Sequence, residues 1–363
     1  MHIVLFILVL FVLVLVHEWG HFIVAKKTGM RVDEFGIGFP PRLFGIKKGE
    51  TLYSINAIPL GGFVKILGED GDVPLSDTEK PRAFSNRPLW AQALVLLAGV
   101  TVNVLFAWVL ISLAFMMGTK NTVDEAAAGP EAKLTVISVL KNSPAAKAGV
   151  VTGDVISKVV NTNGHPVEVL HPSTVSDFIH DAGTVTITYT HGGKEKVTEV
   201  STHDGLVPGD PNKRVIGINM GLVEETHRPF FTAIYEAGGY TLTSIVSIAV
   251  GISHLAYDAL RFKADFSGVA GPVGIAGMVG DAASMGAATL LIFMALISLN
   301  LAVINVLPFP ALDGGRLLLV IIEWMKGSAL SPRISQGLNA IGFILLLVLM
   351  GAVTYNDILK IIH

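Results

Sequence analysis

A histidine–glutamate–histidine group near the amino end has the residue types of a metal site. His17 and His21 stand four positions apart, and Glu18 directly follows the first histidine. On a helix, positions i and i+4 lie on one face with Cβ atoms about 5–6 Å apart. Both imidazoles can then reach one zinc ion at about 2.0–2.1 Å. Glu18 would stand beside that ion, where a carboxylate can act as the general base of peptide hydrolysis.

The position of this group in the chain makes the pattern more informative. His17 follows a long run made almost entirely of Leu, Val, Ile and Phe. Ionisable side chains at membrane depth are costly, and they need partners there. We therefore expect a functional site inside a membrane helix, and we consider a plain histidine face at the membrane surface the weaker interpretation.

A catalytic zinc site needs a third protein ligand and one open position. Asp313 is the best candidate, because it follows an apolar block that is interrupted by Pro308 and Pro310. A broken helix is tolerated at membrane depth where it is buried in protein or lines a wet cavity. Alone, Asp313 would read as an ordinary Asp-Gly turn. The carboxylates of Asp265, Asp281 and Glu323 are less well placed, since they stand in polar segments.

Composition indicates that the elements carrying these residues lie in a membrane. Of the 363 residues, 51% are hydrophobic and only 15% are charged, whereas soluble domains have about 25% charged residues. The net charge of -3 gives no reason to expect a nucleic-acid partner. The chain has no cysteine, which excludes disulfides, thiolate nucleophiles and cysteine-ligated zinc.

Four apolar blocks are candidates for spanning helices, which need about 20 mostly apolar residues. They cover residues 2–25, 89–117, 287–306 and 341–353. The stretch 230–260 is ambiguous, because it carries three ionisable residues among its Gly, Ser and Thr. For this stretch we favour a membrane-surface or re-entrant helix over a true span.

Charge asymmetry predicts the orientation. Lys and Arg cluster after the first span, before the second, and between the third and the fourth. The positive-inside rule places these loops in the cytoplasm. The large 119–229 segment would then lie outside. Four spans place all these charged loops on the cytoplasmic side. A fifth span at 230–260 would move the loop between the third and the fourth apolar block to the opposite side.

Two segments read as β structure. Residues 35–41 look like a loop or tight turn, and residues 51–67 read as strand, turn, strand around Pro59 and a Gly-Gly pair. An edge in this hairpin region can accept an extended peptide, although a plain structural hairpin fits the sequence as well. Within 131–205, short β-rich runs surround a Ser-Pro-Ala…Gly-Asp pattern at 143–154, which resembles a bacterial PDZ domain.

Together these motifs resemble the site-2 protease family of intramembrane metalloproteases, in the bacterial branch that includes the regulator of sigma-E protease. The matching segments are 17–21, 35–40, 58–65, 271–275 and 305–315, with the PDZ-like segment between them. Two features depart from the family. Val100 follows Ala98-Gly99 where an Ala-Gly-Pro turn is common, although Gly99 and Asn103 keep a Gly-x-x-x-Asn spacing. The chain also has room for one PDZ domain, not two.

The resemblance implies that His17, His21 and Asp313 bind Zn²⁺, that Glu18 is the general base, and that Asn305 helps to hold substrate. It implies cleavage of single-pass membrane proteins, either anti-sigma factor type proteins or remnant signal peptides, in regulated intramembrane proteolysis. The edge of the hairpin around Ile55 to Val64 would pair with an unwound substrate helix, and the PDZ-like domain would bind a peptide ligand. The protein would be a multi-pass protein of the inner cell membrane, with its active site towards the cytoplasmic side and its PDZ-like domain outside.

We therefore expect a multi-pass α-helical membrane protein of about four spans, with a cytoplasmic-side β-hairpin region and an external PDZ-like α+β domain. Its expected segments are a first span at 1–26, a hairpin and loop region at 27–88, a second span at 89–118, the PDZ-like domain at 119–229, a membrane-surface helix and loop at 230–283, a third span at 284–314, and a fourth at 335–358.

Three other functions fit the sequence less well. Ser253 and His254 superficially suggest an intramembrane serine protease, but adjacent helical residues point away from each other. A transporter would call for related halves, and none is visible. The main alternative is a non-catalytic PDZ membrane binding protein with a structural metal site. Such sites usually have four protein ligands, and His254 is the candidate fourth.

Overall fold

The computed structural model describes residues 2–69, 75–204, 213–261, 263, 269–328 and 330–362. Asp265, one of the less favoured ligand candidates, lies outside these residues. The chain divides into two compact units. A helical unit comprises residues 1–113, 230–282 and 290–363, and a β-rich unit comprises 114–229 and 283–289. Each is described by itself.

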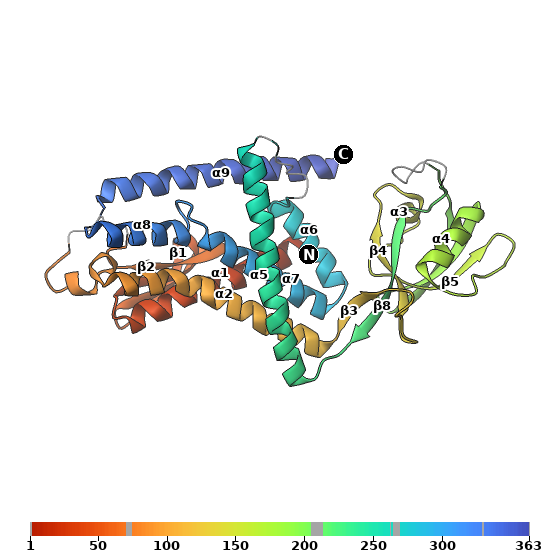
Figure 1. Ribbon diagram of the computed structural model, residues 1–363, viewed down its shortest axis with the longest axis horizontal. Coiled ribbons are helices and arrows are strands. Elements are labelled where there is room, and N and C mark those ends of the chain that lie inside the picture. Colours follow the sequence, from red (N-terminus) through yellow and green to blue (C-terminus); the bar gives the residue numbers. More distant parts are fainter. Residues whose placement is uncertain are drawn as a thin grey trace. The chain divides into compact units, whose positions relative to one another are not determined.

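The helical unit is built from long apolar helices (Figure 1). Five helices among the described residues are long and apolar enough to cross a membrane by length and composition. They and the two shorter helices of this unit are α1 (His2–Lys27), α2 (Leu89–Met117), α5 (Phe230–Leu260), α6 (Pro272–Ser284), α7 (Ala287–Val306), α8 (Asp313–Lys326) and α9 (Pro332–Ile362).

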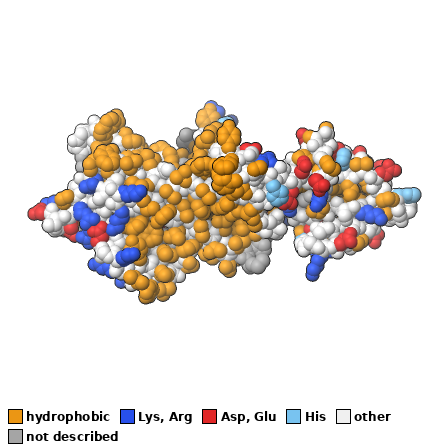
Figure 2. Space-filling model, turned by 90° about the horizontal axis from the view of Figure 1, so that it is seen from below, with side chains coloured by type: hydrophobic (Ala, Val, Ile, Leu, Met, Phe, Trp, Pro, Cys, Tyr) orange, Lys and Arg blue, Asp and Glu red, His pale blue; other side chains and the backbone are white. Residues whose placement is uncertain are grey.

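The surface of the helical unit matches a bilayer environment. Figure 2 shows a broad apolar face over the helices, with Lys, Arg, Asp and Glu gathered at one end. Many large apolar side chains of this unit are exposed, such as Leu8 on α1, Val109 on α2 and Val348 on α9. In water such a surface would be an aggregation hazard. In a membrane it is the face that lipid covers.

Helix α5 differs from the other long helices in direction. It is one unbroken helix of 31 residues, or about 46 Å at 1.5 Å per residue. In Figure 1 it runs across the line of α2 and α9 instead of along it. Its amino-terminal part is held to α2, where the Trp108 indole N–H donates to the Ile234 carbonyl at 2.9 Å.

A small β structure packs against α1. Strand β1 (Val32–Lys48) and strand β2 (Thr51–Ile66) form a long hairpin. Residues 34–37 of β1 pair on one side with 52–55 and on the other with 62–65. Strand β2 therefore bends at about residues 57–61 and returns along the other side of β1. The bend matches the predicted strand, turn, strand.

This arrangement corrects two details of the sequence prediction. Residues 35–39, expected as a loop or turn, belong to the central run of β1, and the chain turns only at Pro40 and Pro41. Ile55 was expected on a free edge, but it pairs with both Ile37 and Phe44. Strand propensity predicts that a segment is a strand but not which strands lie beside it, so it did not predict these two partners of Ile55. The run 62–66 does border the sheet.

The β-rich unit contains a six-stranded sheet in the order β3-β8-β4-β5-β6-β7. Ser143 caps α3 by accepting from the Ala146 N–H, and Pro144 follows at the first helical position. Asp154 is buried and accepts from the Val151 N–H and from His191. The elements are β3 (Thr119–Val123), β4 (Lys133–Val139), α3 (Pro144–Lys147), β5 (Val155–Asn161), α4 (Pro172–Asp181), β6 (Thr184–His191), β7 (Lys194–Ser201) and β8 (Ile218–Thr226).

Candidate active site

Three side chains from distant parts of the chain converge in the helical unit. His17 Nε2 and His21 Nε2 lie 3.1 and 3.2 Å from Asp313 Oδ2, and the two imidazole nitrogens are 3.1 Å apart. Both histidines are buried, and the Asp313 side chain is about one-fifth exposed. Among the described residues, this is the cluster of His, Asp and Glu side chains that can hold a metal ion.

The break between α7 and α8 delivers Asp313 to this cluster. Helix α7 ends at Val306, Pro308 follows, and Asp313 is the first residue of α8. The turn is tight because the next two residues are glycines. A Cβ on Gly314 would collide with the Val306 and Leu307 carbonyls, and one on Gly315 with the Phe309 carbonyl. The Asp-Gly-Gly sequence is thus a packing requirement of this turn.

Helix α2 orients both imidazoles from behind. His21 Nδ1 lies 2.8 Å from the carbonyl oxygen of Val95. A carbonyl can only accept, so Nδ1 carries the hydrogen and Nε2 presents its lone pair to the cluster. The Asn103 amide nitrogen lies 3.2 Å from His17 Nδ1, and Asn103 is fully buried. Its Oδ1 has no hydrogen-bond partner among the described residues.

Glycines allow α1 and α2 to approach this closely. A Cβ on Gly99 would lie 2.7 Å from His17 Cε1 and still closer to His21 Nε2. On the other helix, a Cβ on Gly20 would lie 2.6 Å from the Ala98 carbonyl oxygen. Small residues permit such close packing of membrane helices. Here they bring the α2 backbone against the imidazole rings.

The three converging atoms fit a zinc ion. Ligand atoms at about 2.0–2.1 Å from a tetrahedral zinc ion lie about 3.3 Å from each other, and the three separations here are 3.1–3.2 Å. Two imidazoles and a carboxylate form the donor set of many catalytic zinc sites. The ring nitrogens that face away from the cluster are hydrogen-bonded, as is usual for metal-bound histidines.

Glu18 lies in a cavity of about 330 Å³ that the three clustered side chains also line. Its carboxylate faces the backbone N–H of Val64. Phe63, Val64 and Ile66 of β2 form one wall of this cavity. The run 62–66, at the border of the small sheet, therefore runs beside the residues that can do chemistry.

The remaining sequence candidates fall into two groups. Asn305 is buried, and its amide nitrogen lies 3.4 Å from His17 Nε2, so it stands beside the cluster. His254 and Ser253 are exposed on α5. Within the described residues His254 is not part of the metal-binding cluster, and the Ser253 hydroxyl donates to the Ala249 carbonyl of its own helix.

Sequence reasoning did not assign a role to four nearby residues. Val95 and Asn103 orient the histidines, and only the Gly99-x-x-x-Asn103 spacing hinted at this part of α2. Glu69 and Arg316 form an ion pair, and both line the cavity that contains Glu18. A pair separated by 247 positions leaves no local pattern in the sequence.

Comparisons with known proteins show the family of this chain. Residues 5–349 match the peptidase family M50. The chain belongs to this family. It is an intramembrane zinc metalloprotease and a multi-pass membrane protein, as the resemblance to site-2 proteases predicted.

Several relatives match over nearly their whole length. A Clostridium perfringens protein, assigned by name as a zinc metalloprotease, is 34% identical over 364 residues, with 99% of each chain covered. The zinc metalloprotease RasP of Shouchella clausii is 28% identical over 434 residues, with 98% of each covered. Among solved structures, the PDZ domain of an SdrC-like protein from Listeria monocytogenes is 25% identical, covers 26% of this chain and 90% of its own, and has a TM-score of 0.21.

Proposed function

We propose that this M50 peptidase cuts single-pass membrane proteins, with His17, His21 and Asp313 holding zinc and Glu18 acting as the general base. The observation that carries the proposal is the convergence of these three side chains, within 3.2 Å of one another, in the same cavity as Glu18. Three protein ligands leave a coordination position open, which is the arrangement of catalytic and not of structural zinc sites.

Each side chain has a defined task in this mechanism. Bound zinc supplies a Lewis acid that polarises a peptide carbonyl and lowers the pKa of water to about 7. Glu18 takes the proton from the attacking water and returns it to the leaving amide nitrogen. The Val64 N–H, which faces the Glu18 carboxylate, can hold this carboxylate in place. Asn305, beside His17, can donate its amide N–H groups to the substrate backbone.

A membrane helix must unwind before its peptide bonds can be cut, since its carbonyls are engaged in internal hydrogen bonds. Residues 62–66 run along the catalytic cavity and can pair with the unwound segment by strand addition. Val64→Pro removes a backbone N–H that faces the Glu18 carboxylate as well as the cavity in which the substrate would pair, so the variant tests both contacts together. We expect cleavage to fall about tenfold or more with zinc content kept. Unchanged cleavage would remove strand pairing from the mechanism.

The substrates proposed are anti-sigma factor type proteins or remnant signal peptides, cut at the cytoplasmic side of the inner membrane. Figure 2 shows the charges of the helical unit gathered at one end, which supports this side. Lys26, Arg31 and Arg82, from the segments predicted to be cytoplasmic, form ion pairs with Glu50 and Glu79. The β-rich unit would lie outside and bind a peptide as PDZ domains do. The direction of α5, across the other long helices, supports a position along the membrane surface.

The deciding experiment compares wild type with Glu18→Gln on a tagged single-pass substrate in cells. Glutamine keeps the size of the side chain but cannot accept a proton, so intact substrate should accumulate. Glu168→Gln, an exposed position of the β-rich unit, is the matched control and should cut normally. Equal cutting by Glu18→Gln would instead favour a binding protein with a structural metal site. His17→Ala should in addition lose zinc.

A further inference from the structure

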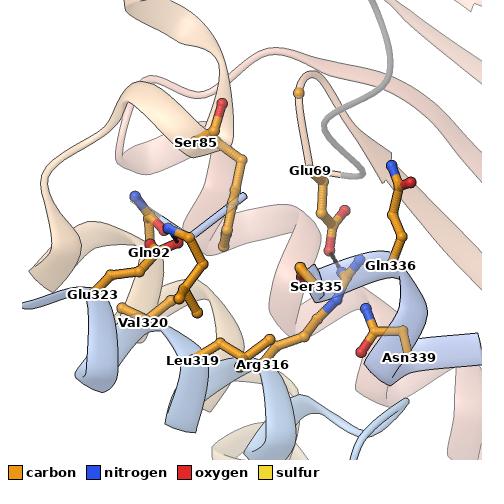
Figure 3. Close-up of a pocket in the computed structure, with 13 residues that line it drawn as sticks. Glu69, Ser85, Gln92, Arg316, Leu319, Val320, Glu323, Ser335, Gln336 and Asn339 are labelled. Atoms are coloured by element: carbon orange, nitrogen blue, oxygen red, sulfur yellow. Dashed lines mark hydrogen bonds and ion pairs between the residues drawn. The ribbon is translucent and has the colours of Figure 1, made fainter. Parts of the chain in front are cut away.

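A second cavity of about 320 Å³ adjoins the catalytic one. It is lined by the start of α2, one face of α8 and the start of α9, and Figure 3 shows its polar side chains converging. Two lining residues, Glu69 and Arg316, also line the catalytic cavity. Their side chains form an ion pair (Figure 3). The two cavities therefore share one polar wall.

The small sheet leads from one cavity to the other. The border run 62–66 passes Glu18, and three residues after Ile66 the chain reaches Glu69 at the shared wall. An extended peptide advances about 3.3 Å per residue. A substrate segment paired with this run would thus place side chains a few positions from the cut in or near the second cavity.

The charge of the second cavity determines which kind of substrate side chain it would favour. Among the described residues that line it, the charged groups are Glu69, Glu323 and Arg316. Arg316 compensates Glu69, which leaves one net negative charge at Glu323. The Glu323 carboxylate is half-buried and accepts from the Leu330 N–H, and within the described part of the chain it makes no ion pair. Gln92, Gln336 and Asn339 add uncharged hydrogen-bonding groups.

We propose that the second cavity is a specificity subsite for a basic side chain of the substrate, with Glu323 as the recognising group. The proposal rests on the proposed function, cleavage of single-pass membrane proteins. Such proteins carry Lys and Arg on their cytoplasmic flank whichever way they cross the membrane. The second cavity lies towards the charged end of the helical unit, where such a flank would emerge.

The test uses purified full-length enzyme in detergent, where changes of charge cannot alter the topology of the substrate. The substrate is one that wild type cuts, in three versions whose charged residues within six positions on the cytoplasmic side of the cut are replaced by Lys, by Gln or by Glu. We expect wild type to prefer the Lys version over the Glu version about five- to tenfold in kcat/KM. The difference should appear mainly in KM, because the contact is remote from the reacting bond.

Variants of Glu323 locate this preference. Glu323→Gln should level the rates of the Lys and Glu versions, and Glu323→Lys should reverse the preference. A faster reaction with the Glu version cannot come from misfolding. Asp77→Lys makes the same change of charge at an exposed position in the loop before α2, outside the cavity. It should keep the wild-type preference, which controls for long-range electrostatics.

Two results would overturn the proposal, and they differ from failure of the proposed function. If wild type cuts all three versions equally, the second cavity does not read charge. If Glu323→Lys keeps the wild-type preference, or Asp77→Lys reverses it, a group other than Glu323 determines the preference for charge. Both leave the protease mechanism intact. Only a wild type that cuts no single-pass substrate of any charge would overturn the proposed function and this subsite together.

Discussion

At the scale of single residues, the site depends on groups that contact the Nδ1 atoms of the histidines, which face away from the cluster. A histidine that binds metal through Nε2 has its hydrogen on Nδ1, and it needs an acceptor there. For His21 this acceptor is the Val95 carbonyl. For His17 it has to be the Asn103 amide, whose oxygen and nitrogen exchange places by a half-turn of the amide group.

The first prediction therefore concerns Asn103. Asn103→Leu removes the acceptor, and we expect zinc affinity to fall about 10- to 100-fold. Asn103→Asp keeps an acceptor and should retain zinc at least as tightly as wild type. Competition of the purified protein with a chelator measures both. If Leu and Asp lower the affinity equally, the residue fills space and does not orient His17.

A second residue-scale prediction concerns Gly99. Gly99→Ala places a methyl group against both imidazoles, so the rings must turn away and zinc content should fall about tenfold. Gly239→Ala is a matched control, since its Cβ would meet no heavy atom within 4 Å. Metal analysis after membrane purification compares the two variants. Full zinc content in Gly99→Ala would show that the helices separate without cost.

At the scale of elements, the hairpin of β1 and β2 is tied down at its tip. Glu50, in the turn between the strands, accepts from Arg82 and from Lys26 of α1. The Arg82 hydrogen bonds first, and then Lys26, lower the pKa of Glu50 from 4.5 to about 2. The tip of the hairpin is thus anchored through charge.

This anchoring predicts a dependence on pH. Because the folded-state pKa is lowered, the stabilisation is present above about pH 4.5 and is lost as the pH falls towards 2. Hydrogen exchange of residues 32–66 should therefore accelerate over this window in wild type. Glu50→Gln should exchange faster already at neutral pH and lose the dependence. A wild-type profile that the substitution leaves unchanged would exclude Glu50 as the anchor.

At the scale of the whole molecule, the open question is the side of the membrane on which each part lies. The chain has no cysteine, so single cysteines report on sidedness without background. In intact cells an impermeant maleimide should label Glu195→Cys in the β-rich unit but reach Asp77→Cys only after lysis. The reverse pattern would invert the topology.

The same experiment decides the position of α5. Arg261 follows the end of this helix and is exposed. If α5 lies along the outer membrane surface, Arg261→Cys should be labelled in intact cells. If α5 crosses the membrane, labelling should require lysis. The second result would add a span and break the parity that the charged loops predict.

The sequence by itself determined what depends on local spacing and composition. Two histidines at i and i+4 lie on one face of any helix, so the candidate metal-binding pair could be proposed without knowledge of the fold. Long apolar blocks predict membrane helices because the bilayer sets their length. Asp313 could be proposed because the site needs a third ligand and because the segment resembles a known family, which the comparisons confirmed.

Contacts between residues that are distant in the sequence became known only from the tertiary structure. Residues 34–37 pair with two separate runs of β2, which moved Ile55 into the interior of the sheet. The contacts of Asn103 and Gly99 with the histidines, and the Glu69–Arg316 pair, join positions far apart in the chain. Such contacts follow from how helices and strands pack, and packing is set by the whole chain at once. The local spacing of residues therefore does not predict these contacts.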